Sequence, residues 1–170
     1  NAELVGGWGA DIATSGINLD YQKLVRQRIA EAVTAAISGM SPARVTFGSI
    51  PVEDGPEHDM KRYVSDSRDP VVIDNTLHTM QFLDISNTPP KPIATLVNWA
   101  HHPESVGSAN HQITSDFVHF LRDELEQKGA GTVVYVSGAL GGQIGPGRVV
   151  PTDELGMPVA EAGFKKAELI

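Results

Sequence analysis

The chain has no cysteine among its 170 residues. This absence excludes disulfide bonds and thiolate metal ligands, but it fits either side of a membrane and identifies no compartment. The sequence also lacks any apolar run approaching the roughly 20 residues that a membrane-spanning helix needs. Basic residues are few, since 13 Lys and Arg stand against 21 Asp and Glu, for a formal net charge of −8. Because so acidic a surface repels phosphate backbones, no nucleic-acid partner is expected.

What is present is the composition of a globular protein. Hydrophobic residues make up 41% and charged residues 20%, which is enough apolar material for a core and argues against a disordered tail. The chain begins at Asn1 without an initiator Met or signal peptide, and residues 163–170 read as helical turns without a stop signal. We therefore expect residues 1–170 to be a single partial domain, cut at both ends from a longer chain. The rest of that chain is expected to be a partner of this domain.

Apolar periodicity predicts the main elements of the first half. A helix is expected over about 19–38, where apolar residues recur every four positions, with Asp20 as its N-terminal cap. Strands are expected at 45–50 and 76–85. The intervening run from 51 to 70 is polar and contains three prolines, so we expect a surface excursion there.

The second half reads as a βαβ unit. Residues 93–100 and 132–136 are apolar on both faces and are expected to be buried strands. A helix from about 115 to 128, capped by Thr114, connects them, which makes the two strands parallel neighbours. We therefore predict an α/β fold in which a mixed sheet contains a parallel βαβ unit flanked by helices. Ligands of such sheets bind at the carboxyl ends of the strands.

Two histidines follow the first of these strands directly, in the sequence His101-His102-Pro103-Glu104. Adjacent residues on an extended chain point to opposite faces, so at most one of the pair can serve a given metal. Pro103 holds the residue before it extended, which favours His102 as a single zinc ligand. The alternative is that one histidine packs beneath the loop and the other is solvated, because a lone His-Pro pair is a weak signal.

Three nearby residues are weaker candidates. Asp116 lies in the first turn of the second helix, and we expect it to interact with the free N–H groups of that turn rather than with a metal. His111 lies in a polar loop, where we expect an ordinary surface position. His119 falls among apolar helical positions, where we expect a half-buried packing residue.

A glycine-rich stretch from Gly138 to Gly147 follows the second strand. It lets backbone N–H groups approach a ligand, as an oxyanion hole or a phosphate cradle requires. Nucleotide binding is disfavoured, since no Lys-Ser/Thr pair follows the glycines. We expect Gly141, Gly142 and Gln143 to bind substrate, and the alternative is a tight structural turn. Because both loops leave from the carboxyl ends of neighbouring parallel strands, they should face each other across one site.

Three blocks of sequence resemble the neutral/alkaline non-lysosomal ceramidase family and look like its uncharacterised bacterial members. They run from Val97 to Ser105, from Ile113 to Asp116 and from Val136 to Pro146, and Trp8-Gly9 ahead of the first helix fits as well. The resemblance covers nearly the whole chain. It implies part of the N-terminal domain of a secreted zinc amidase of lipid metabolism, which splits the N-acyl bond of ceramide.

The resemblance also implies a cofactor. The family's zinc is held by two histidines, a glutamate and a tyrosine, and His102 matches the histidine of its His-Pro block. The other three ligands would fall before Asn1 and beyond Ile170, so this chain would supply one zinc ligand of four. The implied location is extracellular or periplasmic, and the implied partner is a small-molecule or lipid substrate.

The family's catalytic serine is missing. Its Gly-Asp-x-Ser-Pro motif corresponds here to Gly142-Gln143-Ile144-Gly145-Pro146, and Gly145 offers no nucleophile at the position of the serine. The expected function is therefore hydrolysis of an amide or ester bond by a zinc-bound water, whose pKa falls from about 15.7 to about 7. No catalytic side chain is assigned. The alternative is a non-catalytic binding or structural module that kept the fold and lost the chemistry.

Overall fold

The computed structural model describes residues 18–52, 65–66, 68–70, 72–107, 110–140, 143–144 and 167–168. The chain divides into two compact units, Asn1–Ser41 and Pro42–Ile170. Within the described residues, no helix is long and apolar enough to cross a membrane. The single partial domain over residues 1–170 stays a prediction.

The first unit contains helix α1, Leu19–Ser38, as the apolar periodicity predicts. Its N-terminal cap is Asn18, whose Oδ1 accepts a hydrogen bond from the Tyr21 N–H at 2.9 Å. The prediction of Asp20 as the cap is wrong, because the capping oxygen must come from the extended residue before the first turn, and Asp20 lies inside that turn. At the other end, the Gly39 N–H donates back to carbonyls of the last turn.

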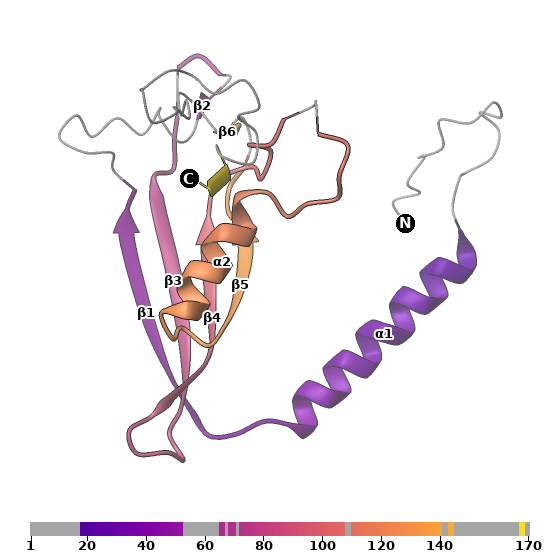
Figure 1. Ribbon diagram of the computed structural model, residues 1–170, viewed down its shortest axis with the longest axis vertical. Coiled ribbons are helices and arrows are strands. Elements are labelled where there is room, and N and C mark those ends of the chain that lie inside the picture. The colour runs from indigo at the N-terminus through magenta and orange to yellow at the C-terminus, as the bar shows by residue number, and fades with distance from the viewer. Residues whose placement is uncertain are drawn as a thin grey trace. The chain divides into compact units, whose positions relative to one another are not determined.

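The second unit is built on a four-stranded sheet in the order β1-β3-β4-β5 (Figure 1). Adjacent strands are antiparallel except for β4 and β5, which are parallel. Helix α2, Phe117–Gln127, connects this parallel pair. The predicted α/β fold with a mixed sheet and a parallel βαβ unit is confirmed. The strands are β1 Ala43–Pro51, β3 Thr76–Asp84, β4 Lys91–Trp99 and β5 Thr132–Ser137.

The two faces of this sheet differ in burial. Thr95, Val97 and Trp99 alternate along β4 on the face that packs against α2, and all three are buried. On the opposite face, Val134 and Val136 of β5 are 46% and 44% exposed. The prediction that both parallel strands are buried on both faces is therefore wrong for the described part of the chain, because the apolar side chains have cover on one face only.

Helix α2 begins later than predicted. Its cap is Asp116, whose Oδ1 accepts a hydrogen bond from the Phe117 N–H at 2.7 Å. The prediction of Thr114 as the cap is wrong, because the Thr114 hydroxyl accepts from the Asp116 N–H instead, at 3.0 Å. Gly129, with φ of +83°, follows the last turn in the left-handed conformation that commonly ends helices.

A second, smaller sheet pairs β2, Ser65–Asp66, with β6, Gln143–Ile144, and lies beyond the carboxyl ends of β4 and β5 (Figure 1). The Asp66 carboxylate accepts two hydrogen bonds from the Arg68 guanidinium, both at 2.8 Å, and one from the Val72 N–H at 2.6 Å. The Arg68 guanidinium holds the pKa of Asp66 far below its usual range. These bonds hold β2, against which Gln143 and Ile144 of the glycine-rich stretch pair.

Candidate functional site

The chain segments leaving β4 and β5 start side by side. Trp99 and Ser137 are opposite each other in the parallel register, and the Gly138 N–H donates to the Trp99 carbonyl at 2.8 Å. A Cβ at Gly138 would lie 3.2–3.4 Å from backbone atoms of Trp99 and Ala100, so glycine permits this close approach. The prediction that the histidine loop and the glycine-rich loop leave from the same edge is confirmed for their first residues.

The predicted substrate-binding residues are described only in part. Gly141 and Gly142 lie outside the described residues. The backbone of Gln143 pairs opposite Asp66 in the small sheet, and its side chain lies outside the description. The substrate-binding role of all three stays a prediction.

The two adjacent histidines have different surroundings. The His101 side chain is fully buried, and its ring centroid lies 4.7 Å from that of Trp99 and 4.5 Å from that of Phe117. The His102 side chain is half-buried, and within the described part of the chain no hydrogen bond engages its ring. The prediction that the pair points into different surroundings is confirmed. Metal binding by His102 stays a prediction.

A tyrosine that the sequence pattern did not single out holds the end of β4. The Tyr135 hydroxyl lies 3.0 Å from the Trp99 carbonyl and 3.1 Å from the His101 carbonyl, and it shares its one proton between them. Burial raises the pKa of Tyr135 to about 12, so the hydroxyl remains a donor at neutral pH. Its signal in the sequence is one polar-tipped residue in the otherwise aliphatic middle of β5.

Asp116 closes the histidine loop at its far end. It is 3% exposed, and beside its bond from Phe117, its Oδ2 accepts from the Val106 N–H at 2.8 Å. Its φ of 59° is a conformation that costs a residue other than glycine on the order of 1–3 kcal/mol. The two hydrogen bonds offset that strain. The prediction that Asp116 serves the free N–H groups at the start of α2 is confirmed.

A hollow of about 400 Å³ lies within this loop. Its lining starts at the residue that follows His102 and includes two carboxylates, an amide and a hydroxyl. It is therefore a polar space next to the candidate zinc ligand. The described lining residues are Pro103, Glu104, Val106, Gly107, Asn110, Thr114 and Asp116.

The remaining described histidines near the loop are exposed. His111 is exposed in the loop, as predicted. His119 lies on α2 and pairs with Asp123 at 3.7 Å between Nε2 and Oδ2, with 57% of its side chain exposed. The predicted half-buried packing position of His119 is wrong, because it lies about 200° around the helix from the buried Phe117.

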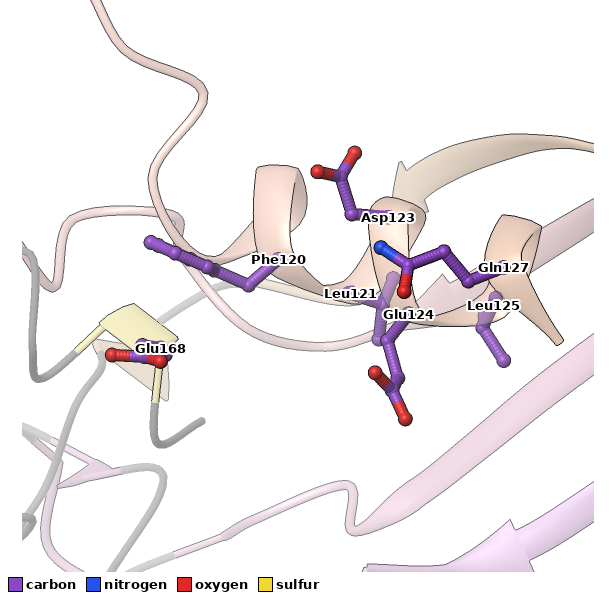
Figure 2. Close-up of a pocket in the computed structure, with 7 residues that line it drawn as sticks. All are labelled: Phe120, Leu121, Asp123, Glu124, Leu125, Gln127 and Glu168. Carbon is purple, nitrogen blue, oxygen red and sulfur yellow. The ribbon is translucent and has the colours of Figure 1, made fainter.

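A second hollow, of about 590 Å³, runs along α2 (Figure 2). Figure 2 shows Phe120 and Glu168 at one end of it and Leu125 and Gln127 at the other. None of its described lining residues is a histidine or a hydroxyl-bearing residue. The described lining therefore offers carboxylates, but no imidazole and no hydroxyl nucleophile.

The described residues meet only part of what a zinc ion requires. They contain no cluster of three His, Asp or Glu side chains that could hold a metal ion, whereas a catalytic zinc takes three protein ligands and a water. His102 meets the requirement for one ligand, because its ring is accessible at a strand end and makes no hydrogen bond in the described part of the chain. The described residues alone do not complete a zinc site.

No protein-family model matches the chain, and no curated protein matches it. Solved structures do. The crystal structure of neutral ceramidase from Pseudomonas aeruginosa aligns with a TM-score of 0.60 over 87% of this chain and 25% of that chain, at 15% identity. The structure of a ceramidase complexed with C2 aligns with a TM-score of 0.55 over 81% and 23%, also at 15% identity. The chain thus spans about a quarter of the length of these neighbours, and its fold is ceramidase-like.

Proposed function

We propose that this chain forms part of a zinc-dependent hydrolase that cleaves amide or ester bonds of lipid or other N-acyl substrates outside the cytoplasm. The observation that carries the proposal is the hydrogen bond from Gly138 to Trp99, which joins the starts of the histidine loop and the glycine-rich loop. Ligands of α/β sheets bind at this end of the strands. The likeness of the fold to a neutral ceramidase supports the same function.

Each part of the proposed site has a separate task. His102 would hold zinc through a ring nitrogen, and zinc bound there would lower the pKa of a water toward neutral pH. The backbone N–H groups of Gly141 and Gly142 bind the substrate carbonyl and the negative charge that develops on it. Gly145 supplies no nucleophile, so none of these residues forms a covalent bond to the substrate.

A second candidate is a binding or structural module that shares the fold and performs no chemistry. One observation favours it: Gly145 stands where the resemblance to the ceramidase family places that family's serine. The two candidates differ in zinc stoichiometry. The hydrolase requires about one zinc per chain, and the module requires none.

The test is the metal content of the full-length protein, measured by elemental mass spectrometry after purification without chelators. The wild type should carry about one zinc per chain, and His102→Ala should lose it with little change in the free energy of unfolding. His111→Ala is the matched control, because it removes an exposed imidazole from the same loop and should keep the metal. Unchanged zinc in His102→Ala removes the proposal, and a zinc-free wild type favours the module.

A hydrolysis assay tests the substrate class. Fluorogenic short-chain N-acyl amides and the matched esters should be cleaved by the wild type. Cleavage should stop when a chelator removes zinc and return when zinc is restored. Cleavage that survives complete zinc removal contradicts the proposed chemistry.

A further inference from the structure

His101 is a polar ring in an apolar place. It has no exposed surface and belongs to an aromatic cluster that consists of Trp99, His101, Phe117 and Tyr135. A phenylalanine would fill this space without the cost of burying ring nitrogens, which need hydrogen-bond partners when they leave water. The presence of an imidazole therefore points to a task for its nitrogens.

One of these nitrogens acts on the neighbouring residue. His101 Nδ1 lies 2.8 Å from the His102 carbonyl oxygen. A carbonyl only accepts hydrogen bonds, so Nδ1 carries the proton and donates it. The bond joins the side chain of one residue to the backbone of the next and closes a small ring around the peptide between them. It therefore restrains the backbone torsions of His102, which set the direction of its Cα–Cβ bond.

The same carbonyl is also held from the other side. The Glu104 N–H donates to it at 2.9 Å, and Pro103 between them has a fixed φ. The His101 ring itself is held by its contacts with Trp99 and Phe117. The backbone of His102 is thus connected through the buried imidazole to the core rather than only to the loop.

We propose that His101 is a positioning residue, whose buried imidazole holds the backbone of His102 in the orientation that presents the His102 ring to a metal. The inference rests on the proposed role of His102 in zinc binding. Groups that orient a metal ligand are worth about 10- to 100-fold in metal affinity. His101 would exert this effect through the ligand's carbonyl, without contact to the metal.

Two substitutions in the full-length protein separate positioning from packing. His101→Phe fills the aromatic cluster and removes the donor, so this variant should be more stable than His101→Asn while its affinity for Zn²⁺ falls about 10- to 100-fold below that of the wild type. His101→Asn keeps an N–H near the position of Nδ1 but leaves a smaller side chain in the core, so stability should fall while Zn²⁺ affinity stays at least about tenfold tighter than in His101→Phe. If His101 only packed in the core, the more stable of the two variants would also bind Zn²⁺ more tightly. The opposite ranking of stability and Zn²⁺ affinity therefore requires a positioning role.

Zn²⁺ affinity would be measured by competition with a chelator, and stability by urea unfolding. A second readout needs no metal: amide exchange at Glu104 should accelerate in His101→Phe and stay slow in His101→Asn. If the more stable of the two variants is also the one that binds Zn²⁺ more tightly, the inference is overturned.

The failures can be told apart. If His102→Ala loses zinc but His101→Phe binds it like the wild type, the positioning role is wrong and the proposed function stands. If His102→Ala keeps its zinc, the proposed function is wrong, and the role of His101 as a backbone restraint is then decided by Glu104 exchange. If amide exchange at Glu104 is unchanged in His101→Phe, the role of His101 as a backbone restraint is overturned as well.

Discussion

The two ends of the parallel strand pair are connected in different ways. At the amino ends of β4 and β5, short turns formed by residues 85–90 and 128–131 lead into the strands. At the carboxyl ends, the chain runs through 100–116 before α2 begins, and side chains hold its backbone at both ends. The short turn before β5 depends on the backbone conformation of its two glycines, Gly129 and Gly131, which both have positive φ.

This difference indicates at which end of the strands a substitution can change the free energy of unfolding without changing Zn²⁺ affinity. Glycines at the amino end carry no side chain toward a ligand, so their substitution should change the free energy of unfolding alone. At the carboxyl end, the His101 side chain bonds to the His102 backbone, and Asp116 holds the same loop at Val106. Substitutions there should change both stability and the Zn²⁺ affinity of the full-length protein.

The largest effect is expected from Phe117→Ala at the carboxyl end. Phe117 is 1% exposed, and its ring lies within 5.8 Å of the rings of Trp99, His101 and Tyr135, centroid to centroid. Its truncation should lower the free energy of unfolding by about 3–5 kcal/mol, measured by urea unfolding, and should also weaken Zn²⁺ binding because it frees the His101 ring. Phe120→Ala, at a half-buried position on the same helix, should cost less and leave zinc binding unchanged.

The next effect lies at the amino end, where two glycines provide a matched pair. Both have positive φ, but a Cβ at Gly131 would lie 2.6 Å from the Ile93 carbonyl oxygen, whereas a Cβ at Gly129 would meet no atom within 4 Å. Gly129→Ala should cost about 1–2 kcal/mol from conformation alone, and Gly131→Ala should cost more because backbone must also shift. Zn²⁺ affinity should not change in either variant, and a loss in Gly131→Ala would break the comparison between the two ends.

Sequence patterns predicted the parts of the fold that depend on periodicity and connectivity. Helix α1 and the parallel pairing of β4 with β5 follow from apolar spacing and from the length of the crossover. The helix caps did not follow, because several acceptors lie within three residues of each helix start, and periodicity does not report the backbone conformation of the capping residue, such as the φ of 59° at Asp116. The small sheet was also missed, since strands of two residues have no periodicity and β2 is held by the bonds between Asp66 and Arg68.

The candidate site was predictable to a similar degree. Alternation indicated that His101 and His102 differ in their surroundings, but it did not indicate which of them is buried. That choice depends on Phe117 and Tyr135, which reach the end of β4 from other elements. Contacts of this kind come from tertiary packing, so no local pattern reports them.

A smaller effect is expected at Asp116, where hydrogen bonding and backbone strain oppose each other. Asp116→Ala removes the acceptor for Val106 and Phe117 and should cost about 0.5–2 kcal/mol. Asp116→Gly loses the same acceptor but relieves the positive φ, so it should be more stable than the alanine variant. Urea unfolding measures the order, and equal stability of the two variants would contradict the strain at this residue.

Both Asp116 variants should also bind Zn²⁺ more weakly, because they release the loop at Val106. The control is Asp123→Ala, which removes an exposed carboxylate from the same helix and should change stability by no more than about 0.5 kcal/mol. An Asp116→Gly variant with full Zn²⁺ affinity would show that the carboxyl end can change without affecting the proposed site.

The smallest effect is expected from Tyr135→Phe, which deletes one hydroxyl from the carboxyl end. At neutral pH, losing the bonds to the Trp99 and His101 carbonyls should lower the free energy of unfolding by about 0.5–1.5 kcal/mol. The loss should depend on pH, since burial raises the pKa of Tyr135 from 10.0 to about 12. A raised pKa in the folded state means that the unfolded chain releases this proton first, so the hydroxyl's contribution is complete below about pH 10 and declines as pH rises through 12.

The stability difference between the wild type and Tyr135→Phe should therefore stay constant up to about pH 10 and narrow above it. Urea unfolding of both proteins at matched pH values measures this, and the other tyrosines and the lysines cancel because they titrate in both. A difference that stays constant through pH 12 would mean that the Tyr135 hydroxyl ionises alike in the folded and unfolded states. Burial of the Tyr135 hydroxyl would then give the carboxyl end no stability that depends on its proton, and only His101 and Asp116 would distinguish its loop from the turns at the amino end.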